Sequence, residues 1–341
     1  MTTAPPRDPI ALTVIGGFLG AGKTTLLNAL LREAGDRRLA VLVNDFGAIN
    51  IDAELVQSRE GAMISLKNGC ICCGVSGDFI GELALLRDRR DPPEHVVVEA
   101  SGVADPGAIV ALGDMPGYRR DAAVIVADAE TVRGRAADEA TGPMVRRQLR
   151  AADLIVLNKT DLVTGEDLAA THAWLREVAG PSTAVVEASF GAVAVDVALG
   201  SRPTVQRPRE DGEGCGAYAG HDGDEHDHAG HDHAEHDHTP HPAFETWSWS
   251  GPRPLSGAGL VAELKALPDG IVRAKGLLHL LEDLERRYVL QLVGRRYSIE
   301  ADRPWGDATP ASQLVVIGLP GSVDVDGLTA RFERLVAAPG A

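Results

Sequence analysis

The sequence predicts an α/β fold, with a P-loop domain built on a doubly wound, mostly parallel sheet and a smaller C-terminal α+β domain. Three observations support this prediction. Short apolar runs alternate with helical stretches from residue 10 to about residue 200, most of these runs contain Val, Ile and Leu without polar alternation, and a phosphate-loop motif follows the first run. Parallel strands that helices cover on both faces require this composition.

The first domain is predicted over residues 10–200, with strands and helices in alternation. Its expected strands are Leu12–Ile15, Leu39–Val43, Val96–Val98, Ala122–Ala127, Leu154–Leu157 and Ala184–Glu187. Its expected crossover helices include Thr24–Glu33, Asp78–Leu86 and Asp167–Val178. Parallel strands need such long crossover connections, so the alternation favours a doubly wound sheet.

The composition changes after the first domain. Residues 201–243 are rich in Gly, Asp, Glu, Pro and His and contain almost no large apolar side chains, so we expect a linker that is disordered when metal-free. Residues 244–337 are predicted to form the α+β domain. Its expected elements are strands at Phe244–Trp249, Ile271–Leu280, Arg287–Val293, Arg295–Glu300 and Gln313–Ile317, and helices at Gly259–Leu267 and Val325–Ala337.

The composition also narrows the class of partner and the compartment. The chain has 341 residues, of which 44% are hydrophobic, which is enough for two separate cores. Its net charge of −16 disfavours nucleic acid and anionic membrane surfaces as partners, and no apolar run approaches the ~18 residues of a membrane-spanning helix. Met1–Pro9 lacks the features of a signal peptide, and three of the four cysteines lie together, so we expect a reducing, cytoplasmic location.

A phosphate-binding loop is predicted between the first strand and the first helix. Residues Gly17 to Thr24 match G-x-x-x-x-G-K-[ST] in the strand–loop–helix context that this motif requires. The glycines allow successive backbone N–H groups to face the α- and β-phosphates, Lys23 places a charge near the β- and γ-oxygens, and the Thr24 hydroxyl is expected to bind Mg²⁺. The predicted phosphate contacts are Gly17, Gly20, Ala21, Gly22, Lys23, Thr24 and Thr25.

An acidic residue, Glu99, follows the strand Val96–Val98. A carboxylate at the carboxyl end of a buried strand beside a P-loop is in the position of a Walker-B acid, so we expect Glu99 to hold a Mg²⁺-bound water. Gly102 is expected to direct its N–H toward the γ-phosphate. Lys23, Thr24 and Glu99 are therefore the predicted catalytic residues, and an ordinary strand-end glutamate is the alternative for Glu99.

A guanine-recognition sequence, Asn158-Lys159-Thr160-Asp161, follows the strand Leu154–Leu157. Guanine presents two adjacent donors, and the Asp161 carboxylate can accept from both. Adenine would leave Asp161 facing a ring acceptor, at a cost of several kcal/mol for the unpaired buried group. Lys159 is expected to stack on the base and Asn158 to tie this loop to the P-loop, so GTP is the predicted nucleotide.

Three thiols lie on one short turn, at Cys70, Cys72 and Cys73, with glycines on both sides. Soft thiolates suit Zn²⁺ or Cu(I), and three ligands leave one tetrahedral position open for transfer of the metal. Buried structural cysteines and a thiol redox switch are the alternatives.

The linker carries a second set of metal-binding side chains. Histidines at close spacing on a flexible chain bind divalent ions such as Zn²⁺, Ni²⁺ and Co²⁺ loosely, and a solvated acidic linker is the alternative. The expected loose ligands are His221, His226, His228, His231, His233, His236 and His238, with His241 following them.

Taken in order, these motifs resemble those of CobW-type GTPases, which are metallochaperones related to the HypB and UreG nickel GTPases. The resemblance rests on Gly17–Thr25, Asn44–Gly47, Gly69–Cys73, Glu99–Pro106 and Asn158–Asp161, and it extends more weakly to Val272–Gly276. A His-rich insert between the two domains is also usual in that family.

The resemblance implies GTP-dependent metal delivery, with Mg²⁺ beside the nucleotide and Zn²⁺ or Co²⁺ at the Cys-x-Cys-Cys site. It implies a client metalloprotein or cofactor-assembly enzyme that docks on the C-terminal domain, and a monomer or a nucleotide- or metal-dependent dimer. One position departs from the pattern, because the family commonly has Glu where this chain has Asp45. A carboxylate there is still expected to reach Mg²⁺ or the transferred metal.

Four functions are compatible with these features to different degrees. The first is a GTPase that delivers zinc, and the second is a GTPase that inserts cobalt or iron into a cofactor or metalloenzyme. The third is a metal buffer or sensor whose GTP site only switches its conformation. The fourth is a P-loop small-molecule kinase, which the guanine-recognition sequence at 158–161 disfavours.

Overall fold

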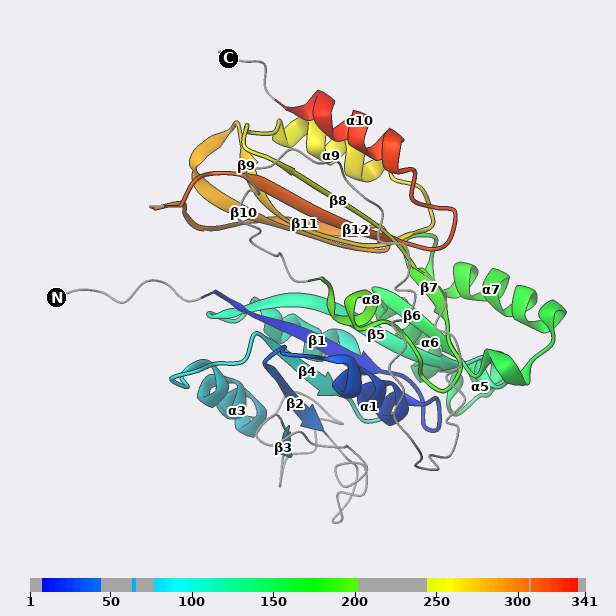
Figure 1. Cartoon of the computed structure of the whole chain (residues 1–341). Helices are drawn as coiled ribbons and strands as arrows, with labels where there is room; N and C mark the ends of the chain where they lie inside the picture. Colours follow the sequence, from blue (N-terminus) through cyan, green and yellow to red (C-terminus); the bar gives the residue numbers. More distant parts are fainter. Residues whose placement is uncertain (1–7, 44–62, 66–76, 202–243, 307, 337–341) are drawn as a thin grey trace, which may run out of the picture.

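The computed structural model describes residues 8–43, 63–65, 77–201, 244–306 and 308–336 (Figure 1). Within these residues the first domain contains a seven-stranded sheet, in the order β3-β2-β4-β1-β5-β6-β7, and all of its pairings are parallel. The predicted doubly wound parallel sheet is therefore confirmed. Its strands are β1 (Ile10–Gly16), β2 (Leu39–Val43), β3 (Met63–Ser65), β4 (His95–Glu99), β5 (Tyr118–Asp128), β6 (Leu154–Asn158) and β7 (Ala184–Glu187).

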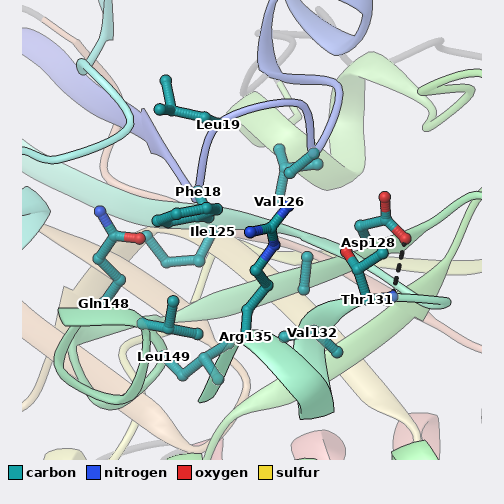
Figure 2. Close-up of a pocket in the computed structure, with 13 residues that line it drawn as sticks. Phe18, Leu19, Ile125, Val126, Asp128, Thr131, Val132, Arg135, Gln148 and Leu149 are labelled. Atoms are coloured by element: carbon teal, nitrogen blue, oxygen red, sulfur yellow. Dashed lines mark hydrogen bonds between the residues drawn. The ribbon is translucent and has the colours of Figure 1, made fainter. Parts of the chain in front are cut away.

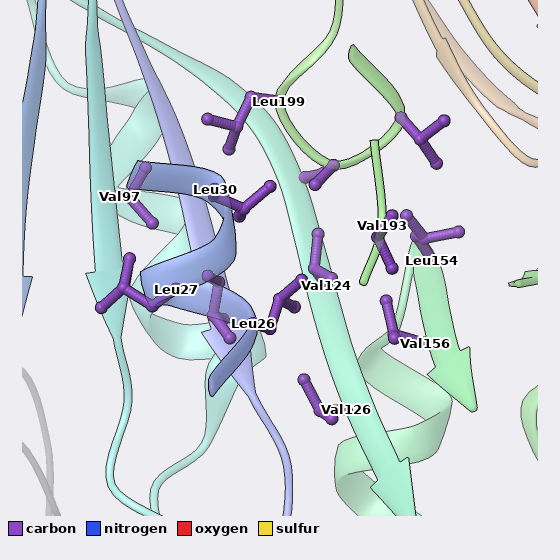
Figure 3. Close-up of a cluster of buried hydrophobic side chains, with 14 of the residues drawn as sticks. Leu26, Leu27, Leu30, Val97, Val124, Val126, Leu154, Val156, Val193 and Leu199 are labelled. Carbon is purple, nitrogen blue, oxygen red and sulfur yellow. The ribbon is translucent and has the colours of Figure 1, made fainter. Parts of the chain in front are cut away.

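Helices cover both faces of this sheet (Figure 1). The helices of the first domain are α1 (Lys23–Glu33), α3 (Gly77–Arg87), α4 (Pro106–Val110), η2 (Ala111–Asp114), α5 (Val132–Ala137), α6 (Gly142–Ala151), η3 (Thr160–Leu162), α7 (Gly165–Ala179) and α8 (Val195–Leu199). Figure 3 shows Leu26, Leu27 and Leu30 of α1 packed toward Val97 and Val124 of the sheet. The burial of this leucine stripe fixes α1, and with it the loop before α1, on the sheet.

The second domain is an antiparallel five-stranded sheet in the order β11-β10-β9-β12-β8, with two helices on one face (Figure 1). Its elements are β8 (Glu245–Gly251), α9 (Gly257–Lys265), β9 (Ile271–Leu280), β10 (Asp283–Val293), β11 (Arg296–Pro304), β12 (Ser312–Gly318) and α10 (Val325–Leu335). Phe332 of α10 packs against Trp247, with ring centroids 5.0 Å apart. The predicted C-terminal α+β domain is thus confirmed.

A buried ion pair joins the two domains. Arg273 of β9 donates from Nη2 to Oδ2 of Asp121 in β5 at 2.5 Å. Its Nη1 donates to the carbonyl oxygens of Val197 and Ala198 in α8, at 3.1 and 2.9 Å. Arg273 is 2% exposed and Asp121 is 7% exposed, so this contact is shielded from water.

A β-bulge places Asp121 in this contact. Leu12 of β1 pairs with Arg120, whereas the next residue, Thr13, pairs with Ala122, so Asp121 is an extra residue in β5. Bulges redirect side chains in this way. The Thr13 hydroxyl donates to Oδ2 of Asp121 at 2.6 Å and lies 2.8 Å from Nε2 of His95.

Several element boundaries differ from the sequence prediction. β5 begins at Tyr118, four residues before the predicted Ala122, and β11 ends at Pro304, four residues beyond the predicted Glu300. Both extensions contain Arg and Asp side chains that pair with other parts of the chain, whereas the prediction relied on apolar runs. Helices α5 and α6 and strand β3 were not predicted.

Candidate nucleotide site

The loop between β1 and α1 has a backbone that only glycine adopts easily. Gly17, Gly20 and Gly22 have φ values of 130°, 78° and 105°. A Cβ at Gly17 would lie 2.2 Å from the carbonyl oxygen of Val126, and a Cβ at Gly22 would lie 2.3 Å from Nδ2 of Asn158. Neighbouring strands therefore leave room for backbone alone, and the loop can turn its N–H groups outward to a phosphate.

Helix α1 begins at Lys23, directly after Gly22. Nζ of Lys23 donates to the carbonyl oxygen of Phe18 at 3.3 Å, so the side chain folds over the loop. The Thr24 hydroxyl donates to Oε1 of Glu99 at 2.7 Å, and Glu99 is 2% exposed at the carboxyl end of β4. The structure thus brings together Lys23, Thr24 and Glu99, which the sequence predicted from two separate motifs.

Gly102 lies against the P-loop, because a Cβ at this position would be 2.9 Å from the backbone nitrogen of Leu19. The side-chain amide of Gln148 in α6 fixes the segment that contains Gly102. Its Nε2 donates to the carbonyl oxygens of Gly102 and Ala104, both at 3.0 Å, and Gln148 is 2% exposed. Sequence reasoning missed Gln148, because a glutamine in an amphipathic helix gives no signal of a distant backbone contact.

Asn158 links the end of β6 to the P-loop. Its Nδ2 donates to the carbonyl oxygen of Ala21 at 2.9 Å, and its Oδ1 accepts from the backbone N–H of Gly191 at 2.9 Å. Lys159 adopts a left-handed backbone with φ of 63°, and its Nζ pairs with Oδ2 of Asp128 at 2.7 Å. Asp161 is exposed in η3, where its carboxylate can accept hydrogen bonds from a base. The roles of these residues toward the nucleotide remain predictions.

A second loop lines the predicted base site, and the sequence reasoning missed it. Residues 188–191 follow β7, and the Thr160 hydroxyl donates to the carbonyl oxygen of Ala188 at 3.2 Å and lies 3.3 Å from Oγ of Ser189. Phe190 is 67% exposed with φ of 53°, an unfavourable backbone for a bulky residue. The available signal was position, since loops after parallel strands meet at one edge of the sheet.

A small apolar cavity lies beneath the P-loop, between β5, α5 and α6 (Figure 2). The guanidinium of Arg135 lies 5.4 Å from the centroid of the Phe18 ring, which closes one side of the cavity. Its volume of about 20 Å³ is enough for a single water. The cavity is therefore a packing gap beneath the loop and is too small for a nucleotide.

The residues present fit a nucleoside triphosphate with Mg²⁺. The glycines give the loop a backbone with positive φ that other residues adopt only with strain, and Lys23 supplies a charge beside it. The Thr24 hydroxyl and the Glu99 carboxylate are hard oxygen donors of the kind that Mg²⁺ prefers. Both lie within reach of the same point at the carboxyl edge of β1 and β4.

The predicted metal-transfer residues lie outside the described residues. These are Asp45, Cys70, Cys72, Cys73 and the linker histidines His221, His226, His228, His231, His233, His236 and His238. Among the residues that the structure describes, no group of three or more His, Cys, Asp or Glu could hold a metal ion. No helix in the described ranges is both long and apolar enough to cross a membrane.

Both domains match known protein families. Residues 11–200 match the CobW/HypB/UreG nucleotide-binding domain, and residues 244–336 match the Cobalamin synthesis protein cobW C-terminal domain. The chain is 32% identical to the zinc chaperone CobW of Sinorhizobium sp, covering 94% of this chain and 96% of that protein. It is 30% identical to the zinc chaperone YjiA of Escherichia coli, covering 92% and 95%.

A solved structure, that of the Zn(II)-bound YjiA GTPase from E. coli, matches over 97% of this chain and 100% of that chain, at 24% identity and a TM-score of 0.43. The two domain matches and the relatives at 30% identity or more, which extend over nearly the whole length, settle the family. The protein is a member of the CobW/HypB/UreG family, with the nucleotide-binding domain followed by the CobW C-terminal domain.

Proposed function

We propose that the protein is a GTP-hydrolysing metallochaperone that binds Zn²⁺ at Cys70, Cys72 and Cys73 and delivers it to a client protein. The observation that carries the GTPase part is the bridge made by Asn158, which joins the predicted guanine loop to the P-loop at Ala21. The zinc part is supported by the relatives named zinc chaperones, which align with nearly the whole chain.

The proposed chemistry is attack of water on the γ-phosphorus, with cleavage of its bond to the β–γ bridging oxygen and release of GDP and phosphate. Lys23 moves from the carbonyl oxygen of Phe18 to the β- and γ-phosphate oxygens, where it stabilises the developing charge. Thr24 and Glu99 would hold Mg²⁺ and its bound water, and the ion would offset part of the charge of the triphosphate. Gly102, supported by Gln148, directs its N–H toward the γ-phosphate.

The GTP preference can be tested at Asp161. Asp161→Asn keeps the size of the side chain but replaces one acceptor oxygen with a donor, so guanine loses one of its two hydrogen bonds. We expect the ratio of GTP to ATP affinity to fall by about 10–100-fold, the value of a hydrogen bond to a charged group. Competition binding with both nucleotides measures the ratio, and Asp167→Asn on exposed α7 is the control. Equal binding of GTP and ATP by the wild type would contradict the guanine assignment.

The metal part can be tested by calorimetric zinc titration of protein that lacks Asp222–His238, which removes most of the loose linker sites. We expect zinc to bind about 5–150-fold more tightly with a non-hydrolysable GTP analogue than with GDP, and zinc to tighten binding of the analogue by the same factor. Cys72→Ser should abolish this difference, whereas Cys215→Ser, at the fourth cysteine of the chain, should not.

Two results would change the proposal. Equal zinc affinities in both nucleotide states would indicate that the nucleotide controls client docking and not metal binding. An unchanged affinity in Cys72→Ser would remove the cysteine cluster as the transfer site. A buffer or sensor is distinguished by turnover, because release of zinc to a competing chelator should accelerate with GTP and not with the analogue.

A further inference from the structure

A large cleft separates the two domains at the edge of the parallel sheet opposite the P-loop. Its volume is about 760 Å³. On one side it is lined by the segments that enter β1, β2, β4 and β5, and on the other by β9, β10 and β11 of the five-stranded sheet, on the face away from α9 and α10 (Figure 1). Among the residues that the structure describes, none of those at the candidate nucleotide site lines this cleft, so the GTPase part of the proposed function does not account for it.

The lining of the cleft is cationic, although the chain as a whole has a net charge of −16. Of the described residues that line the cleft, six are Arg or Lys and three are Asp or Glu, which is an excess of positive charge. The six are Arg37, Arg38, Arg119, Lys275, Arg287 and Arg303, and the three carboxylates are Asp8, Glu94 and Asp302. Such a local excess on an acidic protein attracts anions to this one concave surface.

Lys275 is the least compensated of these cations. Within the described part of the chain, no hydrogen bond or ion pair is made by its Nζ, whereas Arg37 pairs with Asp196, and Arg287 with Asp302. One carboxylate, that of Asp121, favours the charged form of Lys275, but it already accepts from Arg273 and Thr13. Burial, together with nearby Arg119, Arg273 and Arg37, lowers the pKa of Lys275 to about 8.

The neighbours of Lys275 in β9 have structural roles, which sets this residue apart. Arg273 makes the contact between the domains, and Gly276 allows close approach of β12, since a Cβ there would lie 2.6 Å from the carbonyl oxygen of Gln313. Lys275 points from the same face of the strand as Arg273, toward the cleft that it lines.

We propose that this interdomain cleft binds a small polyanion, a molecule with two or more carboxylate or phosphate groups, and that Lys275 is its central contact. The volume is within the range of small-molecule sites. Leu39, Leu277 and Val289 add an apolar wall beside the charges. A ligand anion would supply the counter-charge that Lys275 lacks and would contact both domains at once.

The proposal is tested on the full-length protein with its P-loop saturated by a non-hydrolysable GTP analogue and Mg²⁺, so that the γ-phosphate position is filled and added anions cannot bind there. Two probes, tricarballylate and inorganic phosphate, are titrated separately by calorimetry, which distinguishes a carboxylate ligand from a phosphate ligand. We expect at least one probe to bind the wild type, and Lys275→Gln to weaken it by about ten-fold or more, the value of a charge-assisted hydrogen bond. Lys265→Gln, at an exposed position of α9, is the matched control and should bind as the wild type does.

A second measurement uses the wild type alone, so it does not depend on how the variant folds. The chain has only five lysines, at 23, 67, 159, 265 and 275, so acetylation rates can be followed for each by mass spectrometry. We expect the bound anion to slow acetylation of Lys275 several-fold and to leave that of Lys265 unchanged. Three results would each overturn the proposal. The first is that neither probe binds the wild type, and the second is that the wild type and Lys275→Gln bind a probe equally tightly. The third is that the acetylation rate of Lys275 does not change when the anion is added. The zinc and GTP measurements are unaffected by these outcomes, so this inference fails or holds separately from the proposed function.

Discussion

The carboxyl edge of the parallel sheet and the seam between the domains, where Arg273 contacts Asp121, both contain charged side chains, but the two regions are built in opposite ways. At the carboxyl edge, the polar groups lie on loops with positive φ at Gly17, Gly20 and Gly22, and Asp161 is exposed. At the seam, Arg273 and Asp121 lie on strands and are almost fully buried. The first arrangement leaves hydrogen-bonding groups available to a ligand, whereas the second satisfies them within the protein.

This difference separates residues that act on a ligand from residues that hold the fold. Lys23 donates to a carbonyl oxygen of its own loop and Thr24 donates to Glu99 at the end of β4. A bound nucleotide with Mg²⁺ would compete for both side chains. Nη1 and Nη2 of Arg273 both donate to oxygens of the other domain. We therefore expect substitutions at the carboxyl edge to change activity and substitutions at the seam to change stability.

The largest expected effect is at the seam. Arg273→Ala removes the guanidinium and leaves the Asp121 carboxylate buried without its partner, together with two carbonyl oxygens at the end of α8. Breaking a buried ion pair in this way costs about 3–5 kcal/mol, which we expect as a lower free energy of unfolding in a urea titration.

The matched control is Arg334→Ala, which removes an exposed arginine from α10 and should change the free energy of unfolding by less than about 0.5 kcal/mol. Folded Arg273→Ala protein should hydrolyse GTP within about two-fold of the wild-type rate at a temperature where it remains native, because Arg273 and the oxygens that it contacts belong to segments other than the P-loop. A loss of activity much larger than this would show that the seam acts on the nucleotide site.

The opposite result is expected for Lys23→Ala, with a large loss of activity and little change in stability. Removal of the only P-loop cation at this position should lower GTP hydrolysis by about 10²–10³-fold, or about 2.7–4 kcal/mol of transition-state stabilisation. The free energy of unfolding without nucleotide should change far less than the activity, because the hydrogen bond from Nζ to the carbonyl oxygen of Phe18 is long, at 3.3 Å. Single-turnover hydrolysis and urea titration of the same preparation compare the two quantities, and full retention of activity would exclude the P-loop from the mechanism.

Much of the fold could be predicted because its signals are local. The apolar composition of β2, β4 and β6 identifies buried parallel strands, and the P-loop motif marks the junction of β1 and α1. The start of β5 could not be predicted, because Arg119, Arg120 and Asp121 have the polarity of a loop. They belong to a strand because the second domain covers them, and this burial depends on contacts more than 150 residues away in the chain.

The residues of the candidate site also divide into those that local motifs predict and those that only distant contacts position. Lys23, Thr24, Glu99 and Asn158 belong to motifs whose chemistry is set by residue type and spacing, so the sequence predicted them. Asp128, Gln148 and the loop at 188–191 support those residues through contacts between distant parts of the chain, and no local pattern indicates them. Sequence motifs therefore identify groups that would meet the ligand, and the structure adds the groups that position them.

The smallest expected effect is a pH dependence of stability that originates at the seam. The Thr13 hydroxyl donates its hydrogen to Asp121, so Nε2 of His95 must carry a proton and donate to Thr13. Burial lowers the pKa of His95 to about 3, opposed by Asp121 and reinforced by Lys275, Arg273 and Arg37. His95 is thus neutral in the native protein, whereas in the unfolded chain it has an ordinary pKa of about 6.5.

Between about pH 6.5 and pH 3 the unfolded chain therefore binds one more proton at His95 than the native protein does, and acidification favours unfolding. The free energy of unfolding should fall by up to about 1.4 kcal/mol per pH unit from this residue. Asp121 adds to the loss only below its ordinary pKa of about 3.9. Burial raises the pKa of Asp121, but Arg273, His95 and Lys275 together with the Thr13 hydrogen bond outweigh burial and hold it well below that value. Urea titrations from pH 7 to pH 4.5 isolate the histidine, and His95→Gln, which can still donate to Thr13, should have a slope shallower by about one proton. An unchanged slope in that variant would mean that His95 is protonated in the native seam, and that the seam is more open to water than its burial indicates.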